Sequence, residues 1–177
     1  QNYIQDQYAI LSGYVVSLLV TPTFFCTIIY RLYLPIATDD LYYHKSTAFL
    51  HLLYALLICL LIGLPFTLIF YFFPKQSLMV LYNTTSGYQQ LKYMAFPFLL
   101  FYLQTPLSTI LQAKNKNKVM FIISIIECTL EIILTYTLSH YLYVNAILIS
   151  LFTGLITTLT LSAIYCFKII IKDTSLS

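Results

Sequence analysis

The sequence predicts an all-α fold: a polytopic membrane helix bundle of about five transmembrane helices. Two features of composition indicate this class, because 60% of the 177 residues are hydrophobic and only 8% are charged. A soluble domain carries about 25% charged residues, so this chain cannot cover a surface that faces water. The third observation is that the apolar residues form runs of about 20 residues or more, the length that crosses a bilayer as a helix.

Five such runs are separated by short polar connections. The connection 74–92 is the longest and is amphipathic, so we expect a short helix there that lies at the membrane interface. Gly63, Pro65, Pro97 and Pro106 fall inside the runs and are candidate helix kinks. The expected spans cover approximately residues 8–36, 47–73, 93–113, 119–139 and 143–167.

The basic residues predict the orientation, because short cytoplasmic loops carry an excess of Lys and Arg. Of the nine Lys and Arg residues, two fall on one side of the predicted bundle and seven on the other. We expect the side with seven to be cytoplasmic, which puts the N-terminus outside and the C-terminus inside, in agreement with five spans. The two are Lys75 and Lys92; the seven are Arg31, Lys45, Lys114, Lys116, Lys118, Lys168 and Lys172.

Composition also excludes several function classes. The net charge is +3 and the lysines are dispersed, whereas binding of nucleic acid requires a clustered basic face. No nucleophile motif or glycine-rich phosphate loop occurs, and neither the four cysteines nor His44, His51 and His140 have metal-ligand spacing. The sequence therefore predicts no enzyme activity, no metal and no cofactor. Since it begins with Gln1 rather than Met, we expect it to be part of a longer chain.

Two carboxylates stand in the middle of the fourth expected span. Glu127 and Glu131 share one helix face because they are four residues apart, and Ser124 and Thr135 extend that face. A charge at the centre of a bilayer costs roughly 2.5–3.5 kcal/mol on insertion scales, so this stripe should not face lipid. It is a proton or cation site, a polar wall of a substrate cavity, or a hydrogen-bonded contact between helices.

Other polar residues in the expected spans allow similar pairs of interpretations. Gln104, Ser108 and Gln112 recur every four residues, so they line either a cavity or a helix contact. Arg31 either extends its charge to the headgroups or contacts a phosphate group in a cavity. A ridge of small residues at the same spacing predicts close helix packing in the fifth span, and consists of Ala146, Ser150, Gly154, Thr158 and Ser162.

Four segments, in order along the chain, resemble the multidrug/oligosaccharidyl-lipid/polysaccharide exporter superfamily. "SGYVVSLLVTPTFFCTIIYRLYLPIATDD" is similar to a helix of that family that ends in a turn, here Leu34 to Ala37. "LLIGLPFTLIFYFFP", "PLSTILQAKNKNK" and "YVNAILISLFTGL" are similar to three later helices. The branch that the chain most resembles holds the stage V sporulation protein B and the polysaccharide or peptidoglycan-precursor flippases. The chain departs from that branch at Ala113, in place of a glycine, and at Glu131, in place of a lysine.

The resemblance implies a fold of two six-helix lobes, in which this chain supplies spans eight to twelve, most of the C-terminal lobe. It implies a flippase for lipid-linked oligosaccharides or peptidoglycan precursors that works by alternating access. The implied partners are membrane lipids, a polyprenyl-linked saccharide substrate and the N-terminal lobe of the same transporter. Two alternatives stay open: an ion-coupled multidrug extruder that uses Glu127 or Glu131, and a membrane scaffold that transports nothing.

Overall fold

The computed structural model describes residues 2–43 and 47–174, and in these ranges it contains helices and no strand. The prediction of an all-α membrane helix bundle is confirmed. His44 and Lys45 lie outside the described residues, as does the side chain of Lys172. In chain order the elements are α1 (Asn2–Ile10), a π-helical segment η1 (Leu11–Val16), α2 (Ser17–Val20), α3 (Thr23–Tyr42), α4 (Ala48–Phe72), α5 (Pro74–Tyr82), α6 (Tyr88–Ala113), α7 (Asn117–Leu142) and α8 (Val144–Thr174).

Four helices, α4, α6, α7 and α8, are long and apolar enough to cross a membrane. A fifth span forms if the helical pair Tyr8–Val20 and Thr23–Tyr42, which bends by 41° at the break between them, is counted as one. The expected number of spans is thus confirmed, and the chain is a membrane-embedded helix bundle. The expected boundaries are close to those observed, although α6 begins five residues earlier than expected and α8 continues to Thr174.

The turn expected at Leu34 to Ala37 is wrong, because α3 runs through Pro35 without interruption and ends at Tyr42. A proline inside a helix removes one backbone hydrogen bond. Tertiary packing offsets this loss. Tyr33, Ala37 and Leu41 lie four residues apart, and all three are buried in one apolar cluster with residues of α4, α6, α7 and α8.

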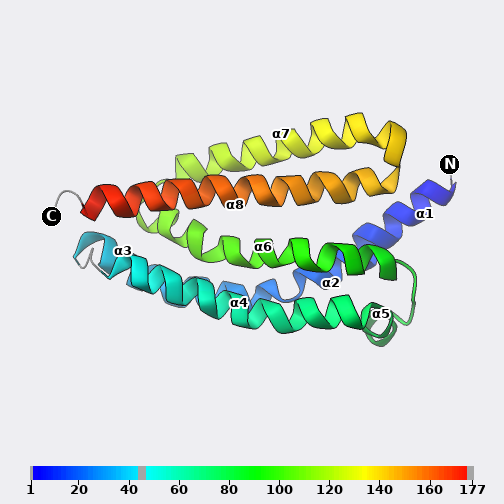
Figure 1. Cartoon of the computed structure of the whole chain (residues 1–177), viewed down its shortest axis with the longest axis horizontal. Coiled ribbons are helices and arrows are strands. Elements are labelled where there is room, and N and C mark those ends of the chain that lie inside the picture. Colours follow the sequence, from blue (N-terminus) through cyan, green and yellow to red (C-terminus); the bar gives the residue numbers. More distant parts are fainter. Residues whose placement is uncertain (1, 44–46, 175–177) are drawn as a thin grey trace.

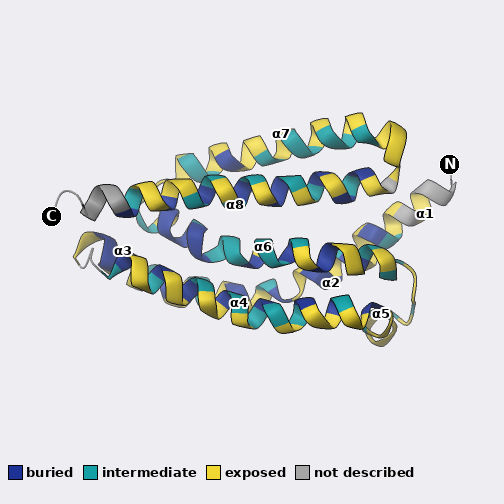
Figure 2. Cartoon of the chain, in the orientation of Figure 1, coloured by how far each residue is buried: buried dark blue, intermediate teal, exposed yellow. Residues whose placement is uncertain are grey.

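The helices traverse the bundle alternately (Figure 1). The N-terminus, α5 and the turn between α7 and α8 lie at one end, whereas the C-terminus and the α3–α4 and α6–α7 connections lie at the other. α6 packs against α3 and α4 on one side and against α8 on the other, and α7 packs mainly against α8. The outer position of α7 leaves Ile123 as its single buried residue, and most of its surface is exposed (Figure 2).

The lysine-rich connection after α6 is a helix-terminating turn. Asn115 adopts a left-handed conformation with φ of 57°, which asparagine tolerates better than most residues. The backbone N–H of Lys116 donates to the Leu111 carbonyl, and that of Asn115 donates to the Gln112 carbonyl, each at 2.8 Å. These two hydrogen bonds satisfy carbonyls that would otherwise lack partners at the end of α6.

Candidate functional site

The two intramembrane carboxylates lie against the small-residue ridge of α8. The side chain of Glu127 lies near that of Thr158, whose hydroxyl donates to the Gly154 carbonyl at 3.0 Å. Glu131 packs on Gly154 so closely that a Cβ at position 154 would lie 2.5 Å from its Oε1 and 3.0 Å from its Cγ. One turn further along, the hydroxyl groups of Thr135 and Ser150 share a hydrogen bond of 2.7 Å. The polar stripe of α7 and the small ridge of α8 are therefore two halves of one helix contact.

This contact explains both sequence patterns together. Small residues on α8 let α7 approach, and the hydroxyl groups on that ridge offer polar neighbours to side chains that lipid would not solvate. Ser150, Thr158 and Ser162 are buried, with 1%, 2% and 3% of their surface exposed. The prediction that the ridge packs against another helix is confirmed. Of the two interpretations of Glu127 and Glu131, the contact with α8 favours helix pairing.

The polar face of α6 has a different environment. Gln104 and Ser108 are half-buried and Gln112 is exposed, while the rest of the C-terminal half of α6 supplies much of the core. The hydroxyl of Ser108 donates back to the Thr105 carbonyl at 2.8 Å. The glutamine and serine side chains therefore lie on a partly exposed side of α6. The buried side of this half consists of Tyr102, Pro106, Leu107, Thr109, Ile110 and Leu111.

Arg31 is not part of either polar group. Its side chain is exposed on α3, and among the described residues it forms no ion pair or side-chain hydrogen bond. The buried side of α3 is formed by Cys26, Tyr33 and Ala37. This position fits the interpretation in which the guanidinium group extends toward the headgroups. The structure thus does not bring the expected site residues into one cluster.

The first span bends by 41° at the break Thr21–Pro22, which was not among the expected kink sites. Pro22 has no N–H to donate, and the Thr21 N–H bonds to the Leu18 carbonyl at 3.2 Å in a tight turn. The carbonyl of Leu19 is satisfied instead by the phenol of Tyr102, which donates to it at 2.7 Å. A side chain of α6 thus completes the backbone hydrogen bonding of a break 83 residues away in sequence.

The four expected kink residues lie inside helices that remain continuous. Pro65 is within α4, and Pro97 and Pro106 are within α6. Gly63 has a packing role, because a Cβ there would lie 2.6 Å from Cδ2 of the Tyr102 ring. Only glycine leaves room for the ring that reaches across to Leu19.

A second polar cluster, which the sequence analysis did not single out, closes the α3–α4 hairpin. Asp40 is 3% exposed; its Oδ2 lies 2.6 Å from Nδ1 of His51, and the hydroxyl of Thr47 donates to Oδ1 at 3.1 Å. The position of Asp40 near the end of a helix was the sequence signal that could have indicated this cluster. An acidic residue in the last turn of a helix opposes the negative end of the helix dipole, so a buried one requires partners.

The cysteines are mostly small buried side chains. Cys26 and Cys59 lie next to each other between α3 and α4, in a cluster with Tyr102, and the Cys166 thiol lies 3.1 Å from the Leu107 carbonyl. Cys128 differs, since it is exposed on α7. Within residues 2–43 and 47–174, no three His, Cys, Asp or Glu residues gather as metal ligands.

The fold and these polar contacts define the class of protein as an α-helical, membrane-embedded bundle with four or five spans. Comparison with known proteins adds no family to this class. No family model, no curated protein and no solved structure matches the chain.

Proposed function

We propose that the chain forms part of a flippase for lipid-linked saccharides. The observation that carries the proposal is the partly exposed polar face of α6, with half-buried Gln104 and Ser108 and exposed Gln112 in a predominantly apolar bundle. Amide and hydroxyl groups at membrane depth require a polar partner or water. The hydroxyl groups of a saccharide can donate to and accept from both kinds of side chain.

In this proposal the α6 face lines one wall of a central cavity. The opposite wall is the second lobe that the resemblance to the exporter superfamily implies. The saccharide headgroup crosses through the cavity while the polyprenyl tail remains in lipid, and the lobes rock to open the cavity to either side. The seven basic residues mark the cytoplasmic side of a cell membrane, with the N-terminus of this chain outside and its C-terminus inside.

The experiment measures movement of a polyprenyl-diphosphate-linked saccharide across vesicles that contain the full-length transporter. Gln104→Leu together with Ser108→Val removes the hydrogen-bonding groups from the face. We expect the rate to fall by about tenfold, since each lost hydrogen bond to substrate contributes roughly 0.5–1.5 kcal/mol. Thr129→Val is the matched control, because Thr129 is exposed on α7 and bonds only to the Ile125 carbonyl.

Rates that are equal in the double variant and the control would contradict the proposal. The same vesicles separate the two alternatives. An ion-coupled drug extruder requires a titrating carboxyl group, so Glu127→Gln and Glu131→Gln would abolish its transport, whereas the packing of both residues on α8 predicts that lipid-linked transport persists. A scaffold would move no substrate in any variant.

A further inference from the structure

Two lysines at the end of the bundle opposite to the lysine-rich turn are each positioned over a tyrosine ring. Lys75 Nζ of α5 lies 4.6 Å from the centroid of the Tyr88 ring at the start of α6. Lys92 Nζ of α6 lies 5.1 Å from the centroid of the Tyr71 ring in the last turns of α4. Both separations fall within the range in which a cation is attracted to the ring face.

The two lysine–tyrosine pairs connect α4, α5 and α6, so all four side chains lie in one corner of the bundle, where these three helices meet. Tyr88 and Lys92 are four residues apart on α6 and share a face, and Tyr71 and Lys75 flank the junction between α4 and α5. Each lysine covers the tyrosine of the other segment. Each ring attracts one ammonium group toward the end of the bundle where α4, α5 and α6 meet.

Among the described residues, no acidic side chain pairs with the lysines of this corner. The sequence contains no Asp or Glu between residues 72 and 92, and neither lysine forms an ion pair within the described ranges. Asp6, at the same end of the bundle, lies on α1, which packs against η1 and α8. A surface that carries two lysine charges without an acidic partner attracts an external anion.

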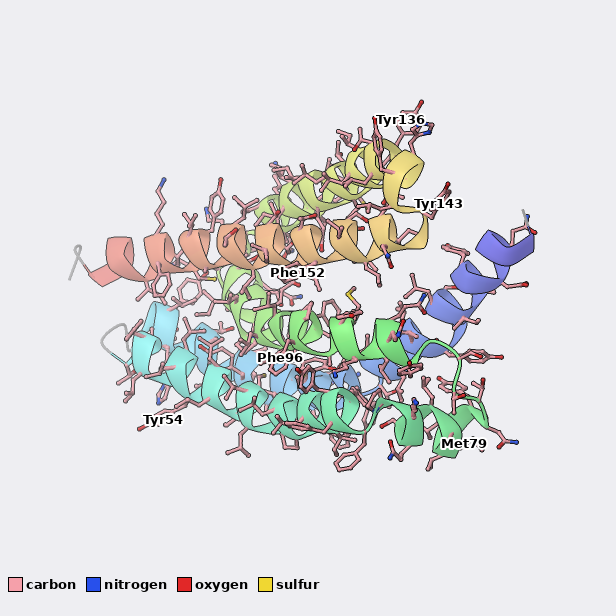
Figure 3. All side chains as sticks on the ribbon, turned by 45° about the vertical axis from the view of Figure 1, so that its right-hand side comes forward. Tyr54, Met79, Phe96, Tyr136, Tyr143 and Phe152 are labelled. Carbon is pink, nitrogen blue, oxygen red and sulfur yellow. The ribbon has the colours of Figure 1, made fainter. Side chains whose placement is uncertain are left out.

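The neighbouring side chains indicate that this corner lies at the membrane interface. α5 has nine residues, about 14 Å of helix at 1.5 Å per residue, so it cannot cross a hydrocarbon core of about 30 Å. It nevertheless exposes Met79, Val80 and Leu81, of which Val80 is 82% exposed. Met79 lies at the outer edge of the bundle, away from α7 and α8 (Figure 3). A short helix with apolar side chains exposed beside lysines belongs at the boundary between acyl chains and headgroups.

We infer that this corner is a binding site for the phosphate group of an anionic phospholipid. Lys75 and Lys92 bind the headgroup phosphate, and Met79, Val80 and Leu81 contact the upper part of the acyl chains. The inference does not depend on transport, and it assigns a role to the two basic residues that lie apart from the other seven.

Native mass spectrometry of the purified chain in detergent tests the site, with equimolar phosphatidylglycerol and phosphatidylcholine added. The unaltered chain should retain phosphatidylglycerol in preference to phosphatidylcholine. Lys75→Gln with Lys92→Gln should lower this preference by about tenfold or more, since each lysine would lose a hydrogen bond from a charged donor to the phosphate, which is stronger than a neutral one. Tyr71→Leu with Tyr88→Leu should also lower it, whereas Tyr71→Phe with Tyr88→Phe retains the ring faces and should keep it.

The matched control is Lys116→Gln with Lys118→Gln, which removes the same charge from exposed positions at the other end of the bundle. It should retain the preference for phosphatidylglycerol. An equal loss in this control would show that only net charge matters and would overturn the assignment. Full retention in the Lys75 and Lys92 double variant, with unchanged helical circular dichroism, would overturn it as well.

Discussion

The phenolic hydroxyl of Tyr102 donates a hydrogen bond of 2.7 Å to the carbonyl oxygen of Leu19. This bond joins the middle of α6 to the break in the first span. Tyr102 is 1% exposed, so no water replaces it. The bond links the break in the first span at Thr21–Pro22 to the packing of the helix that lies at the centre of the bundle.

Tyr102→Phe should lower the free energy of unfolding by about 1–3 kcal/mol, because the buried Leu19 carbonyl loses its donor. The measurement is thermal unfolding in detergent, followed by circular dichroism. Tyr93→Phe is the control and should change nothing, since Tyr93 lies on the same helix and is 72% exposed. Equal effects of the two substitutions would show that the hydrogen bond adds no stability.

Gly63→Ala should destabilise the bundle by about 1–3 kcal/mol, a typical cost of overpacking. The added methyl group would lie 2.6 Å from the ring of Tyr102, which its bond to Leu19 holds in place. Gly13→Ala is the matched control, because nothing lies within 4 Å of a Cβ at position 13. It should stabilise the chain by about 0.5 kcal/mol through a less flexible unfolded state. If Gly63→Ala were neutral in the same unfolding assay, the close approach of α4 and α6 would be refuted.

Gly154→Ala should weaken the contact between α7 and α8 by about 1–3 kcal/mol, because its Cβ would lie 2.5 Å from Oε1 of Glu131. Shortening the opposing side chain with Glu131→Ala removes that clash. The double variant should therefore be more stable than the sum of the single changes predicts, with a coupling of about 1–2 kcal/mol. A double-mutant cycle in detergent measures this coupling, and additive changes would mean that the two residues do not touch.

His51→Ala should cost about 1–3 kcal/mol of stability, because buried Asp40 would lose the imidazole of His51 as a hydrogen-bond partner. Replacing both residues, with Asp40→Leu and His51→Leu, should recover much of the loss, as an apolar pair needs no partner. His140→Ala on exposed α7 serves as control. A double variant less stable than His51→Ala alone would contradict the interpretation that this pair stabilises the contact between α3 and α4.

The predicted orientation is tested with a membrane-impermeant maleimide on intact cells, using a chain in which the four cysteines are replaced by serine. Asn115→Cys should remain unlabelled until the cells are permeabilised, because the lysine-rich turn is expected in the cytoplasm. Gln76→Cys on α5 should be labelled at once, since this residue is exposed at the opposite end. The reverse pattern would invert the topology.

The number and order of the spans were predictable from the sequence. Lipid as solvent requires about 20 apolar residues per helix and internal backbone hydrogen bonds, and both requirements are local properties of the chain. The amphipathic connection 74–92 contains the expected short helix α5. The ends of the helices were less predictable, because the packing of Tyr33, Ala37 and Leu41 carries α3 past Pro35.

The candidate site was predictable only as separate patterns. The sequence by itself determined that Glu127 and Glu131 share one helix face, that Gly154 belongs to a small ridge, and that Gln104, Ser108 and Gln112 align. The tertiary structure decided that the first two patterns meet each other, and that the third stays partly exposed. It also decided the pairing of Tyr102 with Leu19, of Asp40 with His51, and of each lysine with the tyrosine of another segment. The physical reason is that apolar helices gain little from one rotation over another in lipid, so side-chain packing and the need of each polar group for a partner set how the helices face one another.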